Sequence, residues 1–447
     1  MQVGRILACL APNGGEERGK GLSDRWMMEE TDVVIVGAGG GGAVLGLALA
    51  QKGIRTLVLE QASGPPTGLR GELLQPNGQK ILDQLGLLHQ LPVDATRAVS
   101  RFHFCRVGGD RLCTVDYSML PPPYNRALVT LPNVAHHVIL RALETRSPER
   151  LRYGVRFTSL LREGNRVVGL VGDCHGKELR VSAKLVVGAD GPLSRVREAL
   201  KIPTRVHLYR EAYLIGILDD VDGMIEARYF VGRGTILGLF PAAGRKVYLF
   251  YMIPTGSMDR IKVEGLGALR DRWTAIDPSL QKTFRTLVGW DQTAYMPTGR
   301  VRASQWVADG AVLIGDAAHA MNPHASQGRM QAMADAMTLA DLIPACLETG
   351  EWSAAALAPY ERARRPQVEM LQRMADEQVM FWNTKNRLLG FMRDRVFHTL
   401  DRNRRLRYQV LAATAGVREK APFGLLDRLI AAGLLPDPHA DHLPDIG

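Results

Sequence analysis

The stretch TDVVIVGAGGGGAVLGLALAQ, residues 31–51, indicates how this chain folds. Its first six residues form a β-branched run that predicts a buried parallel strand. Residues 43–51 continue as a predicted helix, and a second apolar strand is predicted over residues 56–60. Between strand and helix, the spacing GxGxxG is met by Gly37, Gly39 and Gly42. This order of strand, glycines, helix and strand predicts a βαβ unit that binds a dinucleotide.

The residue types in this unit suit that role. Without side chains, the glycines let the backbone turn tightly and approach a pyrophosphate, which then lies at the positive N-terminus of the helix. Glu60 ends the second strand, 18 residues beyond Gly42, where a carboxylate can bind the hydroxyls of an adenosine ribose. Gln61 follows directly. We therefore count Glu60 and Gln61 as candidate cofactor-binding residues.

Two later stretches also end an apolar strand in an acidic residue beside a glycine. Residues 185–191 end in Asp190 and Gly191, and residues 310–316 end in Gly315 and Asp316. Together with the first motif, over about residues 30–370, the set resembles the class A flavoprotein monooxygenases with the p-hydroxybenzoate hydroxylase fold. The resemblance implies that FAD is the cofactor and that Asp316 bonds its ribityl chain. It also implies that Asp190 lies near the FAD pyrophosphate and ribose and helps in NAD(P)H binding.

A shorter segment carries a second resemblance. Arg70-Gly71-Glu72-Leu73-Leu74-Gln75-Pro76 is similar to the corresponding segment of squalene epoxidases, and the chain also resembles ubiquinone-biosynthesis hydroxylases. By that resemblance Arg70 approaches the flavin, where a guanidinium offsets negative charge on the reduced ring. From the residues alone, Arg70 and Glu72 have the alternative of forming a solvated surface pair.

The loop after the Gly-Asp motif departs in part from the family pattern Pro-x-x-Gly-Gln-Gly-x-Asn. The resemblance implies that this loop leads into a helix N-terminus beneath the flavin pyrimidine edge, where backbone N–H groups stabilise negative charge. Ser326 and Met330 replace a glycine and an asparagine of the family pattern. We therefore do not predict the flavin movement that is usual in the family. The loop residues that match the pattern and become candidate FAD residues are Pro323, Gln327 and Gly328.

We predict an α/β (α+β) fold, with a Rossmann-like FAD-binding domain, an inserted antiparallel-sheet substrate domain and C-terminal helices. Strand-like runs at 226–231, 235–240 and 246–253, with glycine turns and without intervening helices, predict the antiparallel sheet. The predicted units are a disordered extension over 1–27, an FAD-binding domain over 28–98, 125–205 and 295–365, a substrate domain over 99–124 and 206–294, and a helical region over 366–447.

We expect the substrate between the flavin and the antiparallel sheet. No residue is assigned a certain catalytic role, because the oxygen chemistry belongs to the cofactor. The apolar runs of the sheet carry few charges, which favours a lipophilic small molecule: an apolar aromatic, a prenylated ring or an isoprenoid. Strand side chains of this kind also have the alternative of being core. The candidate substrate contacts are His324, Tyr213, Tyr229, Phe240, Tyr251 and Met330.

The resemblance implies a monooxygenase that uses NAD(P)H and O₂. In that cycle NAD(P)H reduces FAD, O₂ adds at flavin C4a, and the C4a-hydroperoxyflavin hydroxylates or epoxidises the substrate. One alternative is a flavin-dependent prenyl-chain reductase, similar to geranylgeranyl reductases, which does not depend on O₂. The other is a non-catalytic prenyl carrier, which Asp190 and Asp316 argue against because a carrier without FAD has no use for either acid.

Composition and charge limit the class of protein, its metal sites, its location and its partners. The 447 residues are 46% hydrophobic and 23% charged, as in an ordinary α/β enzyme. The five cysteines are scattered without CxxC spacing, so we expect no zinc or other metal site and a cytoplasmic location. Net charge is +10, with eight Lys/Arg between residues 385 and 407. That segment predicts either a helix packed on the FAD domain or a peripheral contact with the inner face of the membrane. No recognition motif accompanies the charge, so we expect no nucleic-acid partner.

Overall fold

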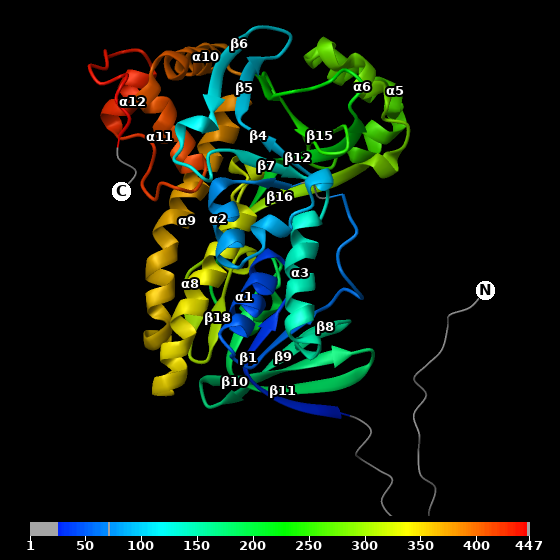
Figure 1. Ribbon diagram of the computed structural model, residues 1–447, viewed down its shortest axis with the longest axis vertical. Coiled ribbons are helices and arrows are strands. Elements are labelled where there is room, and N and C mark those ends of the chain that lie inside the picture. Colours follow the sequence, from blue (N-terminus) through cyan, green and yellow to red (C-terminus); the bar gives the residue numbers. More distant parts are fainter. Residues whose placement is uncertain (1–25, 70–71, 445–447) are drawn as a thin grey trace, which may run out of the picture.

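The structure is a computed structural model that describes residues 26–69 and 72–444 (Figure 1). The lower half in Figure 1 is built on an eight-stranded sheet of order β17-β18-β11-β1-β2-β8, with β10 and β9 branching from β11. β18, β11, β1, β2 and β8 run parallel. The bounds are β1 (Trp26–Val36), β2 (Thr56–Glu60), β8 (Leu151–Tyr153), β9 (Val155–Glu163), β10 (Arg166–Cys174), β11 (Lys177–Gly188), β17 (Val307–Ala308) and β18 (Ala311–Leu313).

Helices cover this parallel sheet, as the dinucleotide-binding prediction requires. α1 packs against α3 and α8, and α9 packs on α8. The central strand β1 is fully buried at Val33–Ile35, because helices shield the sheet from water. The helices of this half are α1 (Gly40–Gln51), α2 (Pro76–Gln84), α3 (Val134–Arg146), α4 (Arg195–Ala199), α7 (Asp316–His319), α8 (Gly328–Thr349) and α9 (Ala354–Trp382).

The upper half contains a seven-stranded sheet of order β16-β12-β15-β14-β13-β5-β6. Its neighbours pair antiparallel, as predicted, except β13 and β5, which run parallel. The α/β fold class with a second sheet is therefore confirmed. The strands are β5 (Arg101–Arg106), β6 (Arg111–Asp116), β12 (Thr204–Asp219), β13 (Ala227–Gly232), β14 (Thr235–Ala242), β15 (Lys246–Pro254) and β16 (Thr293–Ala303).

The two faces of this sheet are covered by different helices (Figure 1). One face packs against α5 (Met258–Ile276) and α6 (Gln281–Arg285) around Trp273 and Phe284. The strands β13 to β15 follow one another without a helix between them, as predicted, and these two helices come after them in the chain. Gly265, with φ of +87°, interrupts α5 and obscures its periodicity in the sequence.

The other face is covered by the C-terminal helices α10 (Arg387–Arg402), α11 (Arg404–Thr414) and α12 (Leu425–Ala431). Phe397, Leu400 and Leu406 belong to the same core cluster as Tyr213 and Tyr229 of the sheet. α10 and α11 thus pack on the seven-stranded sheet, and α11 also contacts the FAD-binding half through the hydrogen bond from Gln327 Nε2 to the carbonyl oxygen of Thr414. Among the described residues, no helix combines the length and hydropathy needed to cross a membrane.

Several predicted boundaries fall inside continuous elements. β16 crosses residue 295 and pairs with β12 as far as Ala303, so the sheet of the upper half extends further than predicted. α9 runs unbroken through residue 366. β1 begins at Trp26, and the rest of the predicted extension lies outside the described residues. A small third sheet joins β3 (Glu72–Leu74), β7 (Ala127–Thr130) and β4 (Thr96–Val99).

Candidate active site

The glycines of the first motif lie where the chain makes its closest backbone approaches. A Cβ on Gly37, whose φ is +102°, would lie 2.4 Å from the carbonyl oxygen of Ala189 on the neighbouring strand end. A Cβ on Gly42 would lie 1.9 Å from the carbonyl oxygen of Gly37. A Cβ on Gly39 would meet no atom within 4 Å. The protein itself thus requires Gly37 and Gly42, whereas Gly39 borders open space at the N-terminus of α1, where a pyrophosphate fits.

The acidic residues at the strand ends are held by the backbone. Glu60 accepts hydrogen bonds from the N–H groups of Ala38 and Ala62, both at 2.9 Å, which fixes its carboxylate beside the glycine turn; Gln61 is exposed next to it. Asp190 accepts from Arg195 N (2.7 Å) and Val196 N (3.1 Å) at the start of α4. Gly191 follows with φ of +81°. A role for Asp190 toward NAD(P)H remains a prediction.

The Gly-Asp motif and the later loop meet at one place. Gly315 has φ of +60°, and Asp316, exposed, begins α7. A Cβ on Gly328, the first residue of α8, would lie 4.0 Å from Asp316 Oδ1. The structure therefore brings Asp316 next to the N-terminus of α8, although the two are twelve residues apart in sequence. A carboxylate and a helix N-terminus at one point suit a hydroxyl-bearing chain such as the ribityl group of FAD.

A buried ion-pair network, which was not predicted, supports this turn. Asp335, fully buried in α8, accepts from Gly315 N (2.9 Å), His319 Nε2 (2.6 Å) and Arg364 Nε (2.9 Å). Burial favours the neutral acid, but the charges of His319 and Arg364 and the N–H of Gly315 together hold the pKa of Asp335 below its usual value. His319 thus has a structural role as a hydrogen-bond partner of Asp335.

Some residues of the loop 323–328 support the protein fold, and others border the site. Pro323 begins a short 3₁₀ turn, and Ser326 adopts φ of +51°, a conformation that favours the glycine found there in the family. The side chain of Gln327 is fully buried and bonds to Asn77 Nδ2 (2.9 Å) and the carbonyl oxygen of Thr414 (2.7 Å). Its side chain therefore joins α2 and α11 to the start of α8, and a contact between Gln327 and FAD stays a prediction.

The imidazole of His324 forms the polar centre of the second part of the site. Its Nε2 lies 2.5 Å from the Tyr213 hydroxyl and its Nδ1 lies 2.7 Å from the Tyr229 hydroxyl. Tyr213 comes from β12 and Tyr229 from β13, whereas His324 comes from the loop between Asp316 and Gly328. Three of the predicted substrate contacts are thereby brought together between the FAD motifs and the seven-stranded sheet.

Aromatic side chains surround this trio. Phe240 belongs to the same core cluster, and Trp382 at the end of α9 packs on His324 at 5.5 Å and on Tyr229 at 5.3 Å between ring centroids. A Cβ on Gly238 would lie 3.0 Å from Tyr229 and 3.1 Å from Phe240, so the missing side chain lets both rings pack closely against the backbone at this glycine. Trp382 was not among the predicted site residues, because this contact depends on the path of the C-terminal chain.

Two predicted substrate contacts lie elsewhere. Tyr251 pairs with Leu214 in the register of β12 and β15 and packs on Trp273, on the face covered by α5. Because side chains alternate between the two faces of a strand, Tyr251 lies on the other face of the sheet from Tyr213. Its assignment as a substrate contact was therefore wrong. Met330 is buried in the core of the FAD-binding half against Gly78 of α2. Arg70 lies outside the described residues.

All three side chains of the trio are neutral, and the number of their N–H and O–H groups limits which hydrogen bonds they can form. Burial lowers the pKa of His324 to about 3 and raises the pKa values of Tyr213 and Tyr229 above their usual range. A neutral imidazole has one N–H and one bare nitrogen. One tyrosine therefore donates to His324 and the other accepts from it, which leaves the accepting tyrosine free to donate its own O–H to a ligand.

Lowering the pH from 7 to 5 is expected to reduce the free energy of unfolding by about 2 kcal/mol through His324. The folded ring, with a pKa of about 3, stays neutral, whereas the ring in the unfolded chain takes up a proton near its usual pKa of 6.5. The stabilising contribution is complete above pH 6.5 and declines as the pH falls toward 3. Urea unfolding at both pH values measures it, with His324→Gln as the comparison. An equal pH dependence in protein and variant would contradict the assignment.

The sequence pattern of the FAD binding domain family matches residues 30–375. The chain belongs to this family. The match spans the glycine turn, Asp190, Asp316 and the loop to Gly328, and the open space at Gly39 fits the cofactor that the family binds. FAD is thus the cofactor of this FAD-binding domain protein, and NAD(P)H is the usual electron donor of such flavoproteins.

Relatives of this FAD-binding domain protein are monooxygenases. The 6-methylpretetramide 4-monooxygenase of Streptomyces rimosus is 30% identical over 349 residues, which cover 77% of this chain and 82% of that protein. Squalene epoxidase 5 of Arabidopsis thaliana is 26% identical over 321 residues, 70% of this chain and 61% of that protein. The crystal structure of p-nitrophenol 4-monooxygenase PnpA from Pseudomonas putida DLL-E4 superposes with a TM-score of 0.75 at 20% identity, over 86% of this chain and 97% of that one. The protein is an oxidoreductase of this type, and the predicted resemblance is confirmed.

Proposed function

We propose that this flavoprotein uses NAD(P)H and O₂ to hydroxylate or epoxidise a lipophilic substrate, an apolar aromatic, a prenylated ring or an isoprenoid. The observation that carries the proposal is the trio Tyr213–His324–Tyr229. A small polar group enclosed by aromatic side chains suits a molecule that is mostly apolar and carries one polar function. The relatives named for 6-methylpretetramide and for squalene are consistent with substrates of this class.

Bound FAD would be held by the glycine turn, Glu60 and Asp316 and would supply the activation of O₂ with electrons from NAD(P)H. The chain's own residues then position the substrate. The tyrosine that accepts from His324 donates its O–H to an oxygen of the substrate, which fixes the ring or alkene relative to the cofactor. Phe240 and Trp382 exclude water from the same space, which protects reactive species from hydrolysis.

The amide of Asn322 adds a further donor at this place. It lies beside the Tyr213 hydroxyl, and its Nδ2 has no hydrogen-bond partner of good geometry among the described residues, although the side chain is 1% exposed. Buried donors are normally satisfied, so Asn322 Nδ2 is available to an acceptor on a ligand. We include it with Tyr213 and Tyr229 in the polar anchor of the substrate.

The function is tested with purified, FAD-loaded protein and a panel of prenylated quinones, quinolones, polyenes and phenols. NAD(P)H oxidation, O₂ uptake and product mass are followed together. A compound that stimulates both NAD(P)H oxidation and O₂ uptake and gains one oxygen atom supports the proposal. A gain of two hydrogen atoms without O₂ uptake would identify a prenyl-chain reductase instead, and a protein that stays colourless with added FAD would revive the carrier.

A lipophilic substrate also gives the protein a reason to approach a lipid surface. We therefore propose a peripheral membrane contact through the basic C-terminal helix. The exposed residues of α10 support this contact, and their arrangement indicates which kind of lipid is bound.

A further inference from the structure

Exposed large hydrophobic side chains concentrate in the C-terminal helices. Among the described residues, eleven of the twenty-one such side chains lie between residues 380 and 443. Single exposed apolar side chains are ordinary on a protein surface, but a contiguous group marks an interaction surface. The eleven are Met380, Leu388, Leu389, Phe391, Met392, Leu425, Leu426, Leu429, Leu434, Leu435 and Leu443.

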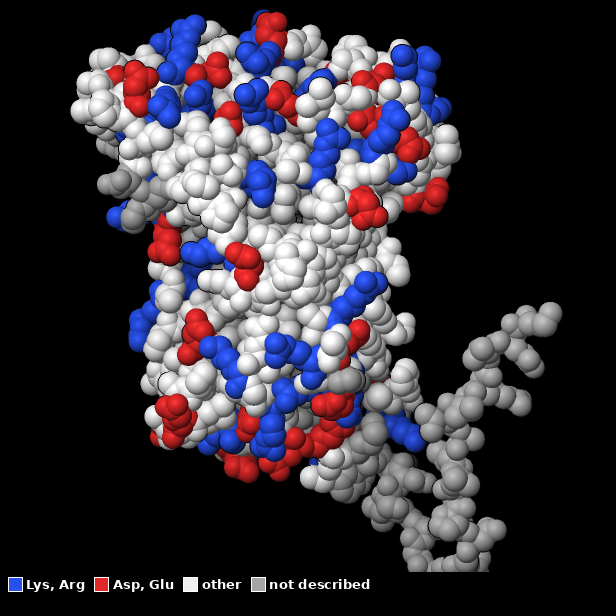
Figure 2. All heavy atoms as spheres, viewed as in Figure 1, with Lys and Arg blue, Asp and Glu red and all other residues white. Residues whose placement is uncertain are grey.

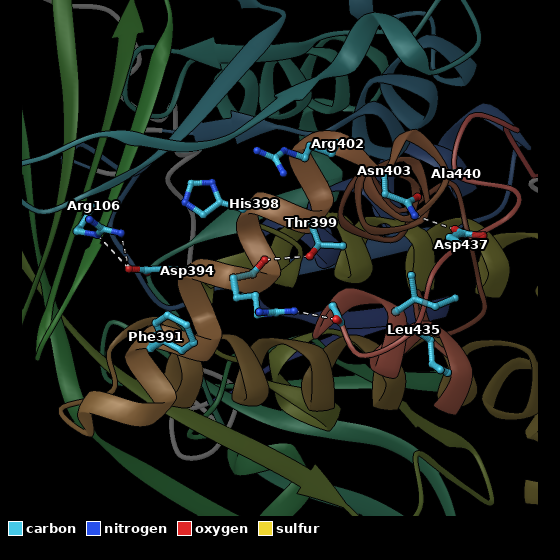
Figure 3. A pocket seen from close by; sticks show the side chains of 13 residues that line it. Arg106, Phe391, Asp394, His398, Thr399, Arg402, Asn403, Leu435, Asp437 and Ala440 are labelled. Atoms are coloured by element: carbon cyan, nitrogen blue, oxygen red, sulfur yellow. Dashed lines mark hydrogen bonds and ion pairs between the residues drawn. The ribbon is translucent and has the colours of Figure 1, made fainter.

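The outward stripe of α10 combines apolar and cationic residues. Leu388, Phe391, Arg395, His398 and Arg402 follow one another at intervals of three or four residues and all are exposed, so they share one face of the helix. Leu388 and Phe391, 68% and 64% exposed, lie toward the N-terminal end, and the cationic residues lie toward the other end. Figure 3 shows Phe391, His398 and Arg402 along this helix.

Two hollows join α10 to the segment after α12. The first, about 650 Å³, is lined by Phe391 and His398 on one side and by Leu435 on the other (Figure 3). Arg395 closes its floor by donating to the carbonyl oxygens of Ala432 and Gly433, both at 2.8 Å. The second, about 660 Å³, shares Leu435 with the first and continues to Leu426 and Leu443. Phe391 of α10, Leu426 of α12 and the later Leu435 and Leu443 therefore border one surface. We call this surface, together with the exposed side chains of residues 385–404 and 425–443 around it, the C-terminal docking face.

Four exposed cations of this face have no acidic partner among the described residues. Lys385, Arg387, Arg402 and Arg404 are exposed and take part in none of the ion pairs formed by the described residues. In contrast, Asp394 pairs with Arg106 at 3.0 Å, and Asp427 and Asp437 both pair with Arg405. In Figure 2 the upper left of the molecule, where α10 and α12 lie in Figure 1, carries basic side chains together with some acidic ones and uncharged surface. The face thus combines excess positive charge with exposed apolar groups.

We propose that the C-terminal docking face binds an anionic lipid surface, with the apolar side chains of α10 and α12 entering the headgroup boundary and the cations contacting the lipid phosphates. A free phosphate would account for the cations alone. A second copy of the same face would bring like charges together, because a two-fold interface pairs a patch with itself. An anionic membrane satisfies both features.

The place of this face relative to the site supports the proposal, which rests here on the proposed function. Trp382 ends α9 against His324 and Tyr229, and α10 begins five residues later at Arg387. The intervening Asn383 is tied to the sheet by the hydrogen bond from Gly234 N to its carbonyl oxygen at 2.9 Å. The apolar end of α10 therefore lies beside the aromatic wall of the substrate site, where a lipid-dissolved substrate would be delivered.

The test uses the full, FAD-loaded protein and co-sedimentation with vesicles of phosphatidylcholine alone or with phosphatidylglycerol. Binding is expected to the anionic vesicles, with loss in high salt and little binding to phosphatidylcholine. Neutralising Arg387, Arg402 and Arg404 together to Gln is expected to weaken vesicle binding by roughly fivefold for each cation. The double variant Leu388→Gln, Phe391→Gln is expected to release the protein from vesicles as well.

The matched control is Lys262→Gln, Val263→Gln, an exposed cationic and apolar pair on α5, which is expected to change nothing. Equal binding to neutral and anionic vesicles, or no binding at all, overturns the proposal. So does a concentration-dependent dimer that the α10 variants dissolve, because the occupant would then be a second copy. Vesicle binding can be measured without turnover. If the protein does not bind vesicles but still transfers oxygen to a soluble substrate, only this inference is contradicted. If it binds vesicles but transfers oxygen to no substrate, only the proposed function is contradicted.

Discussion

Gly39→Ala is expected to remove FAD from the purified protein while leaving the fold intact. Its Cβ would meet no protein atom within 4 Å, so the apoprotein should unfold at the same denaturant concentration as the parent. The methyl group would occupy the space through which a pyrophosphate reaches the N–H groups of α1. Each charge-assisted hydrogen bond lost there is worth about 1.5–3 kcal/mol, or roughly 10- to 100-fold in affinity. Absorbance of bound flavin and titration of the apoprotein with FAD measure the effect.

A substitution at a second glycine of the motif distinguishes an effect on cofactor binding from an effect on folding. Gly42→Ala places its Cβ 1.9 Å from the carbonyl oxygen of Gly37, so the backbone must move and both stability and FAD are expected to be lost. Gly267→Ala in α5, whose Cβ would lie 3.9 Å from the nearest atom, Arg270, serves as the neutral control. Full retention of FAD by Gly39→Ala would show that the pyrophosphate does not lie at α1.

Asp335→Ala is expected to lower the free energy of unfolding by about 3–5 kcal/mol, because it leaves the buried Arg364 without its counter-charge. The substitution also removes the acceptor of Gly315 N, so the turn that presents Asp316 loses its support. We therefore expect weaker FAD binding even at temperatures where the variant is folded. Urea unfolding gives the stability, and flavin titration of the folded fraction gives the second effect.

Asp341 on the same helix provides the matched comparison. It pairs with Lys52 at 3.0 Å, but its side chain is 73% exposed. Water screens such a pair, so Asp341→Ala is expected to change stability by less than about 1 kcal/mol. Similar losses in both variants would mean that the Asp335 network contributes no more than a surface ion pair.

The cofactor half of the fold was predictable because its signals are local. β2 agrees with its predicted range, and the glycine turn, Asp190 and Asp316 each follow a strand whose last residues are apolar. A parallel strand buried on both faces and a glycine turn can both be recognised from residues that lie close together in the sequence. The three motifs could therefore be placed in order before any long-range contact was known.

The substrate half was predictable only in part, because its contacts depend on register and on the path of the distant C-terminus. The strands were found, but whether Tyr251 shares a face with Tyr213 depends on the pairing of β12 with β15. Gln327 matches the family loop, yet its side chain bonds to Thr414, a contact across 87 residues. Trp382 reaches His324 because α9 is continuous, which no local pattern reveals.

The position of Trp382 has a consequence for how substrate preference is distributed along the chain. The family pattern ends at residue 375, and Trp382 and all of α10 to α12 lie beyond it. A chain shortened to that point would keep the glycine turn, both motif acids and the Asp335 network, but it would open the aromatic wall at His324 to water. Two proteins alike over 30–375 and different after it would then share a cofactor and an oxidant while selecting different molecules. Grafting residues 376–444 between such proteins is therefore a direct route to exchanging what they oxidise.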